Sequence, residues 1–520
     1  MAFIKEHSRL FVLIVIFLTL LSTSLACALL TPSSGTEEVT FLRSSITLTA
    51  AADSHTEIPV GVLDSSAFLE TVRISQDQRR LAYAKMEDGK YFIILDQFEN
   101  GTYDGIGEES VIFSPDGLRV AYAFYMGDNV YIAIDEEVEG PYLAYGGISF
   151  SPDSQHYAYR AVLDDEEFII IDGIKQQSYD QVDNPHFSPN SQRVLYSARD
   201  SDSWFTVLDG GEGASYEDLG IHLNGFSPDS KRYAVIASKH GKSVVVVDGV
   251  EGVTYDAWGG VLFFTPDSKH VVYGASRGGK WFLIIDEEEI GPYDYIAQGN
   301  PVFSPDGKRM AYLAGDGKDF YYFIDGKKDG PYEPAGTIVF SPDSRRVVYL
   351  GLEGEEWFVI LDGERIGPYQ GVTEPVFSGD SKRVGYVALL EDKAYAFIDQ
   401  DKYGPYDEIG TPIFSPDSQR FAFAGKNDGK YFIVVDGIER GPYELTGFPV
   451  FSPDSRRLAY AVMEGDKSFI IVDDWKSLPY DRILDFDNHT GKGIIFEDDD
   501  HIRYLALLAG EIILVEEDLK

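Results

Sequence analysis

A nearly identical tetrapeptide recurs along this chain and constrains its fold more than any other feature. Variants of Phe-Ser-Pro-Asp occur eleven times between Ile74 and Asp454, and successive copies start 37 to 39 residues apart. So regular a period indicates an array of structural repeats. A residue that every repeat needs is expected to build the repeat rather than to perform chemistry. Seven copies match fully, and these start at Phe113, Phe150, Phe226, Phe303, Phe340, Phe414 and Phe451. The four copies that vary start at Ile74, Phe187, Phe264 and Phe377.

One repeat, residues 412–444, shows the arrangement that the others share. Short apolar runs rich in aromatic and β-branched residues alternate with turn sequences such as Ser-Pro-Asp-Ser and Asn-Asp-Gly-Lys. This pattern predicts strands joined by tight turns. Four strands of about five residues occupy nearly the whole period, so no helix fits within a repeat.

The recurring carboxylates have a structural explanation. Proline presets φ at the first corner of a turn, and Asp or Ser side chains can hydrogen-bond nearby backbone amides. Asp-Gly pairs such as those at Asp209, Asp325 and Asp436 supply the positive φ values that hairpins require. We therefore expect the repeated Asp residues to be turn residues rather than acids for catalysis or metal binding.

Taken together, the turn, the aliphatic-Ala-Tyr strand and the closing Asp-Gly resemble the WD-type repeats of TolB-like β-propellers of exported bacterial proteins. The resemblance covers about residues 74 to 520. It implies an all-β β-propeller of about twelve four-stranded repeats. The family serves many functions, so the resemblance implies a fold rather than an activity.

The two ends of the repeat region are complementary. After the eleventh copy the chain has the sequence pattern of three further strands, up to Val515, which is one strand short of a full repeat. Residues 58–72, before the first copy, contain the pattern of one partial strand. We therefore predict that the N-terminal segment completes the last sheet, which removes an exposed edge. Propellers usually have four to eight blades. Two propellers of about six blades, residues 58–302 and 303–520 with a boundary near Asn300, are expected, with one large ring as the alternative.

The N-terminus predicts export. Lys5 and Arg9 precede an apolar run from Leu10 to Leu21 that ends in small residues, as in a signal peptide covering residues 1–26. Cys27, the only cysteine, resembles the lipidated cysteine of bacterial lipoproteins, although Ser24 stands where that pattern prefers Leu. Lipid anchoring at Cys27 and plain secretion both remain open. Residues 27–57 are rich in Ser and Thr, and we interpret them as a tether. The rest of the chain is expected to be extracytoplasmic, at the cell envelope, in the periplasm or secreted.

The charge of the chain argues against one class of partner. It has 86 acidic and 44 basic side chains, a formal charge of -42. Such a surface repels phosphate backbones and anionic head groups, so nucleic acid is not an expected partner. Contact with a membrane is expected only through lipid on Cys27.

If the repeated residues build the fold, specificity should reside where the repeat is broken. The longest interval, before Phe496, contains Asp485, Asp487 and His489, which only faintly resemble a calcium loop. Trp258 and Trp475 are further irregularities and candidates for ligand contact. His186, just before Phe187, also departs from the pattern. These features indicate no cofactor and no metal.

The sequence leaves three functions open. The first is a non-enzymatic binding or scaffold protein that recognises a protein, peptide or glycan through loops on one face. The second is a propeller hydrolase or lyase that acts on an extracellular polymer, and the third is a structural envelope protein. Gly-x-Ser-x-Gly occurs at Gly274 to Gly278, but in a hairpin pattern without the helix that a nucleophile elbow needs. No catalytic residue is therefore assigned.

Overall fold

The computed structural model describes residues 55–62, 68, 71–107, 109–220, 225–297, 301–336, 338–484 and 493–519. These residues form twelve antiparallel sheets and contain no α-helix. Each sheet is a meander in which sequence order is spatial order, except that sheet 12 also has β1 at its edge, and seven first strands are split into two short pieces. The prediction of an all-β propeller built from twelve four-stranded repeats is confirmed. Whether the sheets belong to one ring or to two stays a prediction.

The chain divides into two compact units, of which the larger is Val60–Gly367. It contains sheets 1 to 8, the last of which ends just past the division. Their strands are: sheet 1, β2 (Arg73–Ile74), β3 (Leu81–Glu87), β4 (Lys90–Leu95), β5 (Phe98–Tyr103); sheet 2, β6 (Gly105–Ile106), β7 (Ile112–Phe113), β8 (Val120–Met126), β9 (Asn129–Ile134), β10 (Glu137–Tyr142); sheet 3, β11 (Ala144–Phe150), β12 (Tyr157–Leu163), β13 (Glu166–Ile171), β14 (Ile174–Tyr179); sheet 4, β15 (Gln181–Val182), β16 (His186–Phe187), β17 (Val194–Asp200), β18 (Ser203–Leu208), β19 (Gly211–Tyr216); sheet 5, β20 (Asp218–Gly220), β21 (Ala234–Lys239), β22 (Lys242–Val247), β23 (Val250–Tyr255); sheet 6, β24 (Ala257–Phe264), β25 (Val271–Arg277), β26 (Lys280–Ile285), β27 (Glu288–Tyr293); sheet 7, β28 (Tyr295–Ile296), β29 (Val302–Phe303), β30 (Met310–Asp316), β31 (Asp319–Ile324), β32 (Lys327–Tyr332); sheet 8, β33 (Ile338–Phe340), β34 (Val347–Glu353), β35 (Glu356–Leu361), β36 (Glu364–Tyr369).

The smaller unit is Pro368–Lys520 with the first 59 residues. Its strands are: sheet 9, β37 (Gly371–Val372), β38 (Val376–Phe377), β39 (Val384–Leu390), β40 (Lys393–Ile398), β41 (Asp401–Tyr406); sheet 10, β42 (Glu408–Ile409), β43 (Ile413–Phe414), β44 (Phe421–Asn427), β45 (Lys430–Val435), β46 (Ile438–Tyr443); sheet 11, β47 (Leu445–Thr446), β48 (Val450–Phe451), β49 (Leu458–Glu464), β50 (Lys467–Val472), β51 (Trp475–Lys476); sheet 12, β52 (Arg482–Leu484), β53 (Ile494–Phe496), β54 (His501–Leu508), β55 (Glu511–Asp518) and, beside β55, β1 (His55–Val62).

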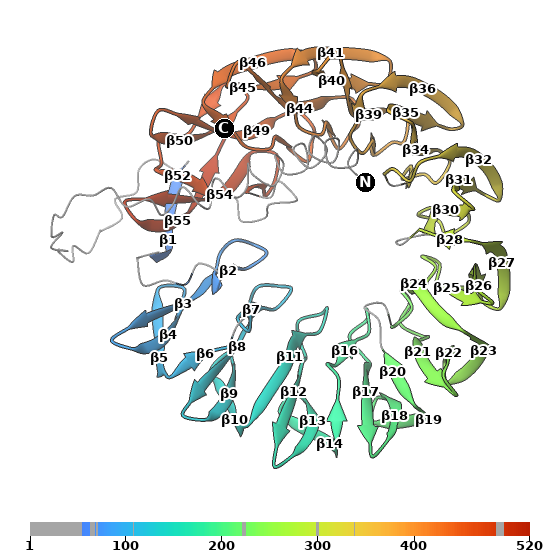
Figure 1. Cartoon of the computed structure of the whole chain (residues 1–520). Helices are drawn as coiled ribbons and strands as arrows, with labels where there is room; N and C mark the ends of the chain where they lie inside the picture. Colours follow the sequence, from blue (N-terminus) through green and yellow to red (C-terminus); the bar gives the residue numbers. More distant parts are fainter. Residues whose placement is uncertain are drawn as a thin grey trace. The chain divides into compact units, whose positions relative to one another are not determined.

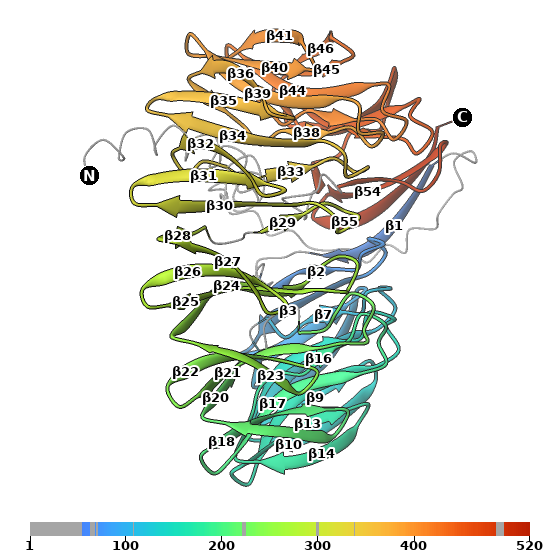
Figure 2. The same ribbon diagram turned by 90° about the vertical axis from the view of Figure 1, so that its right-hand side faces the viewer.

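Consecutive sheets of a unit pack face to face. In the larger unit, first strands such as β7 and β16 lie on one side and fourth strands such as β10 and β14 on the other (Figure 1). Figure 2 shows sheets 3 to 6 stacked one upon the next. Each hydrophobic cluster joins two neighbouring sheets, for example Ala158 and Ile169 of sheet 3 with Tyr196 and Val207 of sheet 4. The cluster around Tyr312 joins sheets 6 and 7 in the same way, so packing is continuous across Asn300.

The Ser-Pro-Asp turns hold this stack together through two different serines. The hydroxyl of Ser227, in the first turn position, donates to Asp229 Oδ1 at 2.7 Å and accepts from the backbone N–H of Arg232 at 3.0 Å. Ser268, in the last position of the following turn, accepts the N–H of Asp229 at 3.0 Å. It has a positive φ of 63°, and two other turns have glycine with a positive φ at the same position, Gly117 and Gly307. A turn therefore closes itself, and it also hydrogen-bonds to the next turn where the last residue of that turn is a serine.

An arginine after the turn adds a second link between sheets. Arg309 pairs with the hairpin residue Asp325 at 2.9 Å and donates to the carbonyl of Arg345 in the next sheet at 2.5 Å. Its guanidinium also lies over the Phe340 ring at 5.1 Å. Asp325 has the positive φ, 50°, expected for the Asp-Gly hairpins. The repeated carboxylates are thus turn and hairpin residues, as the sequence predicted.

Sheet 12 contains both ends of the described chain, because β1 lies beside β55. His55 Nδ1 lies 2.9 Å from Glu517 Oε2, and His55 Nε2 lies 3.3 Å from Glu57 Oε1. The Tyr504 hydroxyl donates to Glu517 at 3.0 Å, and the Tyr480 hydroxyl donates to Glu57 at 3.2 Å. Glu517 is only 5% exposed. Burial disfavours a charged imidazole, but Glu517 and Glu57 outweigh it and raise the pKa of His55. Burial raises the pKa of Glu517.

We expect Ser227→Ala to lower the free energy of unfolding by about 2 kcal/mol, because Asp229 and the N–H of Arg232 lose a buried partner. Ser203→Ala, in an exposed hairpin position, is the control and should change stability little. The measurement is the urea midpoint of both variants. Equal midpoints would mean that the turn serine does not stabilise the stack.

We also expect β1 to bind its sheet less tightly as the pH rises from 6.5 to 9. A group whose pKa is raised by folding stabilises below its unfolded pKa and loses that contribution as the pH passes its folded value. His55 and Glu517 therefore act in the same direction. Hydrogen exchange of β55 amides, corrected for intrinsic rates, should show protection that falls with pH. His55→Gln should flatten this dependence above pH 6.5, and an unchanged slope would contradict the assignment.

Candidate functional site

A pocket lies at the ends of the first strands of sheets 3, 4 and 5 and has a volume of about 280 Å³. Ser149 and Phe150 end β11, His186 and Phe187 form β16, and Gly225 and Phe226 stand at the corresponding place in sheet 5. Turn and loop prolines complete the lining, which consists of Ser149, Phe150, Pro152, Pro185, His186, Phe187, Pro189, Gly225 and Phe226.

The pocket exists because three neighbouring repeats depart from the common sequence at one position. The residue directly before the repeated Phe is a large apolar side chain in seven sheets: Ile112, Phe263, Val302, Val339, Val376, Ile413 and Val450. In sheets 3, 4 and 5 it is Ser149, His186 and Gly225 instead, and in sheet 1, away from the pocket, it is Arg73. Two small residues on either side of a histidine leave the space that an aliphatic side chain fills elsewhere.

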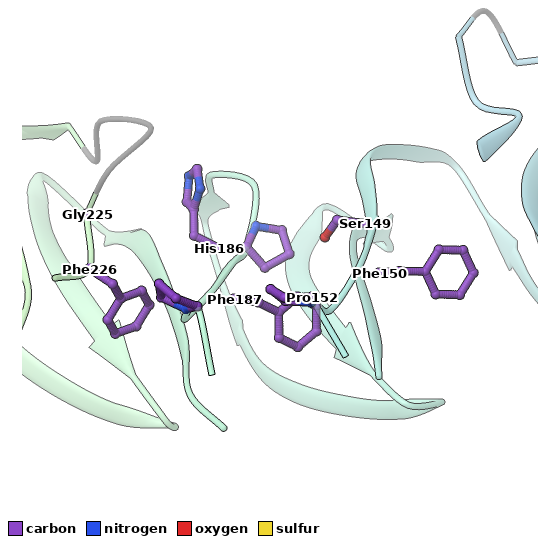
Figure 3. A pocket seen from close by; sticks show the side chains of 9 residues that line it. Ser149, Phe150, Pro152, His186, Phe187, Gly225 and Phe226 are labelled. Carbon is purple, nitrogen blue, oxygen red and sulfur yellow. The ribbon is translucent and has the colours of Figure 1, made fainter. Parts of the chain in front are cut away.

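The lining is apolar on one side and polar on the other. Figure 3 shows Ser149 and His186 at one side of the pocket and the rings of Phe187 and Phe226 at the other. Arg119 of sheet 2 lies over the Phe150 ring at 5.2 Å, and Arg193 lies over the Phe226 ring at 5.8 Å. These stacked guanidinium groups hold both rings in place.

His186 is the titratable group of the pocket. Burial lowers its pKa, and the nearby carboxylate of Asp183 offsets part of that shift. Asp183 in turn accepts a hydrogen bond from the buried hydroxyl of Ser197. His186 is therefore a neutral imidazole at neutral pH, able to donate through one ring nitrogen and to accept through the other. Because Ser197 donates to Asp183, the three residues do not form a nucleophile-activating chain.

The structure places the two tryptophans singled out by the sequence at separate positions. Trp258 lies on β24, opposite Ala275, and packs against the cluster between sheets 5 and 6. Trp475 lies on β51, opposite Val472, and packs against the cluster between sheets 11 and 12. Neither lines the pocket. Cys27, Asp485, Asp487 and His489 lie outside the described residues.

Sequence reasoning missed Ser149 and Gly225, although His186 was noticed as an irregularity. The signal was present in the alignment of the repeats with one another, at the position before the repeated Phe. A serine or glycine attracts no attention alone, and only the structure shows that the three exceptions share one cavity.

Within the described residues, no group of three or more His, Cys, Asp or Glu side chains is arranged to hold a metal ion. A search for membrane-spanning helices in the same residues finds none long and apolar enough.

Comparisons with known proteins give a likeness of fold alone. No protein-family model matches the chain. No curated protein matches it either. Similar solved structures include the eukaryotic initiation factor, with 14% identity over 65% of this chain and 96% of that chain and a TM-score of 0.33. TolB from Acinetobacter baumannii has 16% identity over 49% of this chain and 77% of that chain, with a TM-score of 0.21. The GH74 enzyme of Niastella koreensis has 10% identity over 88% and 91%, with a TM-score of 0.25. At these values the matches carry no argument about what this chain binds or does.

Proposed function

We propose that this chain is an exported, non-enzymatic binding protein, released or held at the cell envelope through Cys27, that recognises a protein or peptide. The observation that carries this proposal is the coincidence of Ser149, His186 and Gly225. This position is apolar in seven of the eleven copies, and three of the four exceptions fall on three consecutive sheets and line one pocket, while the fourth, Arg73, is in sheet 1. Exceptions that cluster in space are the mark of a site rather than of random drift.

The size and lining of the pocket indicate its ligand. Pockets for drug-sized molecules measure about 300–1,000 Å³. At about 280 Å³, this pocket suits a single side chain. Three phenylalanine rings and three prolines favour an aromatic or large aliphatic group, and neutral His186 offers one hydrogen bond. This combination suits a peptide side chain better than a sugar, whose hydroxyls need several polar partners.

The same lining favours binding over catalysis. A hydrolase of extracellular polymers needs a carboxylic acid and a carboxylate beside the scissile bond. None of the nine lining residues is a carboxylate. Among the described residues, the only carboxyl group with a raised pKa is Glu517, and its partners are His55, Tyr504 and the strand β1 rather than a ligand site.

Ser149→Ile should abolish binding at the pocket, because it restores the side chain that Ile112 has in sheet 2. The probe is a displayed library of random heptapeptides selected on the wild-type protein. Enriched peptides should carry an aromatic or large aliphatic residue and should bind Ser149→Ile at least tenfold more weakly. Val302→Ile, at the same repeat position in sheet 7, is the matched control and should bind normally. Peptides that bind Ser149→Ile with unchanged affinity would refute the site.

We expect the same substitution to stabilise the fold. Filling the space with three additional carbon atoms should raise the free energy of unfolding by about 1 kcal/mol, since part of the added area stays exposed. The urea midpoint of Ser149→Ile against that of wild type measures this effect. A lower midpoint would show that the serine is needed for packing and that the pocket is not a functional departure from the repeat.

A further inference from the structure

The turns of sheets 2 to 4 lack a positively charged residue that most other turns have; outside these three sheets only the turn of sheet 10, with Gln419, shares this lack among the eleven copies. Two residues after the turn Asp, sheets 5 to 7 carry Lys231, Lys269 and Lys308. Each pairs with the Asp of its own turn, at 3.1, 2.9 and 3.0 Å respectively. In sheets 2 to 4 the same position holds Leu118, Gln155 and Gln192. The turns of three consecutive sheets therefore have no lysine at this position.

Two turn carboxylates are consequently left without the lysine that other turns supply. Asp116 of sheet 2 and Asp153 of sheet 3 form no ion pair with a lysine or arginine in the described part of the chain. Hydrogen bonds from Ser114 and the N–H of Leu118 lower the pKa of Asp116, and those from Ser151 and the N–H of Gln155 lower the pKa of Asp153. Both carboxylates are thus ionised and exposed on the turn face.

Large apolar side chains are also exposed at the turn end of sheets 1 to 3. Leu118 is 71% exposed, Phe98 of sheet 1 is 75% exposed and Ile174 of sheet 3 is 66% exposed. Phe98 and Ile174 occupy the first position of the fourth strand, where sheets 6 to 8 have charged residues, Glu288, Lys327 and Glu364. At this strand position the larger unit is therefore apolar in sheets 1 and 3, and also at Val250 of sheet 5, whereas it is charged at Glu137 of sheet 2 and in sheets 6 to 8.

Arginines fix these groups into one surface. Arg80 pairs with Asp96, two residues before Phe98, and donates to the carbonyl of Leu118 at 2.5 Å. Arg119 donates to the carbonyl of Gln155 at 3.0 Å and lies over Phe150, which lines the pocket. We call Phe98, Leu118, Gln155 and Ile174, with Asp116 and Asp153, the turn-face patch.

We propose that the turn-face patch binds a protein segment that combines apolar side chains with a lysine or arginine. The partner's cation takes the place beside Asp116 or Asp153 that Lys231 or Lys308 takes in its own turn, and its apolar side chains cover Leu118 and its neighbours. This inference rests on the proposed function and names the chemistry of the partner. A formal charge of -42 steers such a cationic segment toward the protein.

The test uses three synthetic hexapeptides, acetyl-Lys-Leu-Lys-Phe-Lys-Leu-amide and its analogues with Gln or Glu in place of Lys. Fluorescence anisotropy of labelled peptides should show that the lysine peptide binds at least tenfold more tightly than either analogue, and less tightly as salt is raised. Equal affinity of the lysine and glutamine peptides would overturn the proposal.

Gln155→Lys and Gln419→Lys form a matched pair of variants. Both glutamines stand at the same repeat position and donate to the carbonyl of their turn Asp at 3.3 Å. The two variants have the same net charge. Gln155→Lys should weaken the lysine peptide at least fivefold, because its own ammonium neutralises Asp153, whereas Gln419→Lys should not. If both variants bind the lysine peptide equally more weakly, the effect comes from net charge alone and the proposal is overturned. The proposal is also overturned if neither variant binds the peptide more weakly. Leu118→Asn should weaken binding through loss of apolar contact.

The patch and the pocket can fail separately. If Ser149→Ile leaves library-selected peptides bound while Gln155→Lys weakens the lysine peptide, the pocket is refuted and the patch stands. If Ser149→Ile abolishes binding of peptides that contain no lysine or arginine, and Gln155→Lys has no effect, the proposed function stands and the patch is refuted.

Discussion

The hydrogen bond from one Ser-Pro-Asp turn to the next is the constraint on which the rest of the structure depends. A four-stranded sheet of this size cannot bury both faces by itself, so it is stable only against its neighbours. Apolar packing provides the driving force but leaves sheets free to slide. The bond from the N–H of Asp229 to Ser268 recurs wherever the last turn residue is a serine, as at Ser154 and Ser344, and it fixes how far such a sheet is displaced from the previous one. The positive φ of Ser268 is tolerated for this reason.

This constraint separates the positions that fold the chain from those that are free to vary. The turn serine, the turn Asp and the following Arg each make hydrogen bonds or ion pairs that recur with the same geometry from sheet to sheet. The residue directly before the repeated Phe and the residue two places after the turn Asp have side chains without such a recurring contact to the next sheet, although the backbone of the second residue does accept a hydrogen bond from the Arg of the preceding sheet. They contribute only apolar filling or surface charge, which a neighbouring sheet does not require. Ser149, His186, Gly225, Leu118 and Gln155 are all at these two positions, which is why they can differ without loss of the stack.

Much of the fold could be predicted from the sequence because its determinants are local. A period of 37 to 39 residues, turn residues with known φ preferences and strands of alternating pattern specify one sheet without reference to the others. The complementary sequences at the two ends indicated a shared sheet, and β1 does lie beside β55. The group formed by His55, Glu57 and the buried Glu517 was not foreseeable, because residues more than 400 positions apart meet there.

The candidate site could be predicted only in principle. The sequence shows which residues depart from the repeat, but it does not show that their side chains line one cavity. Rare residue types attracted attention, so Trp258 and Trp475 were singled out, and both pack between sheets. The pocket instead depends on what is missing, a large side chain at Ser149 and at Gly225. In a stacked repeat protein the consequences of such a loss remain local, because each sheet contacts only its neighbours. A single loss leaves a small void, whereas losses on consecutive sheets merge into one cavity of about 280 Å³. Adjacency of exceptions, rather than the identity of any one of them, is therefore the sequence signal that distinguishes a site from a defect in such a chain.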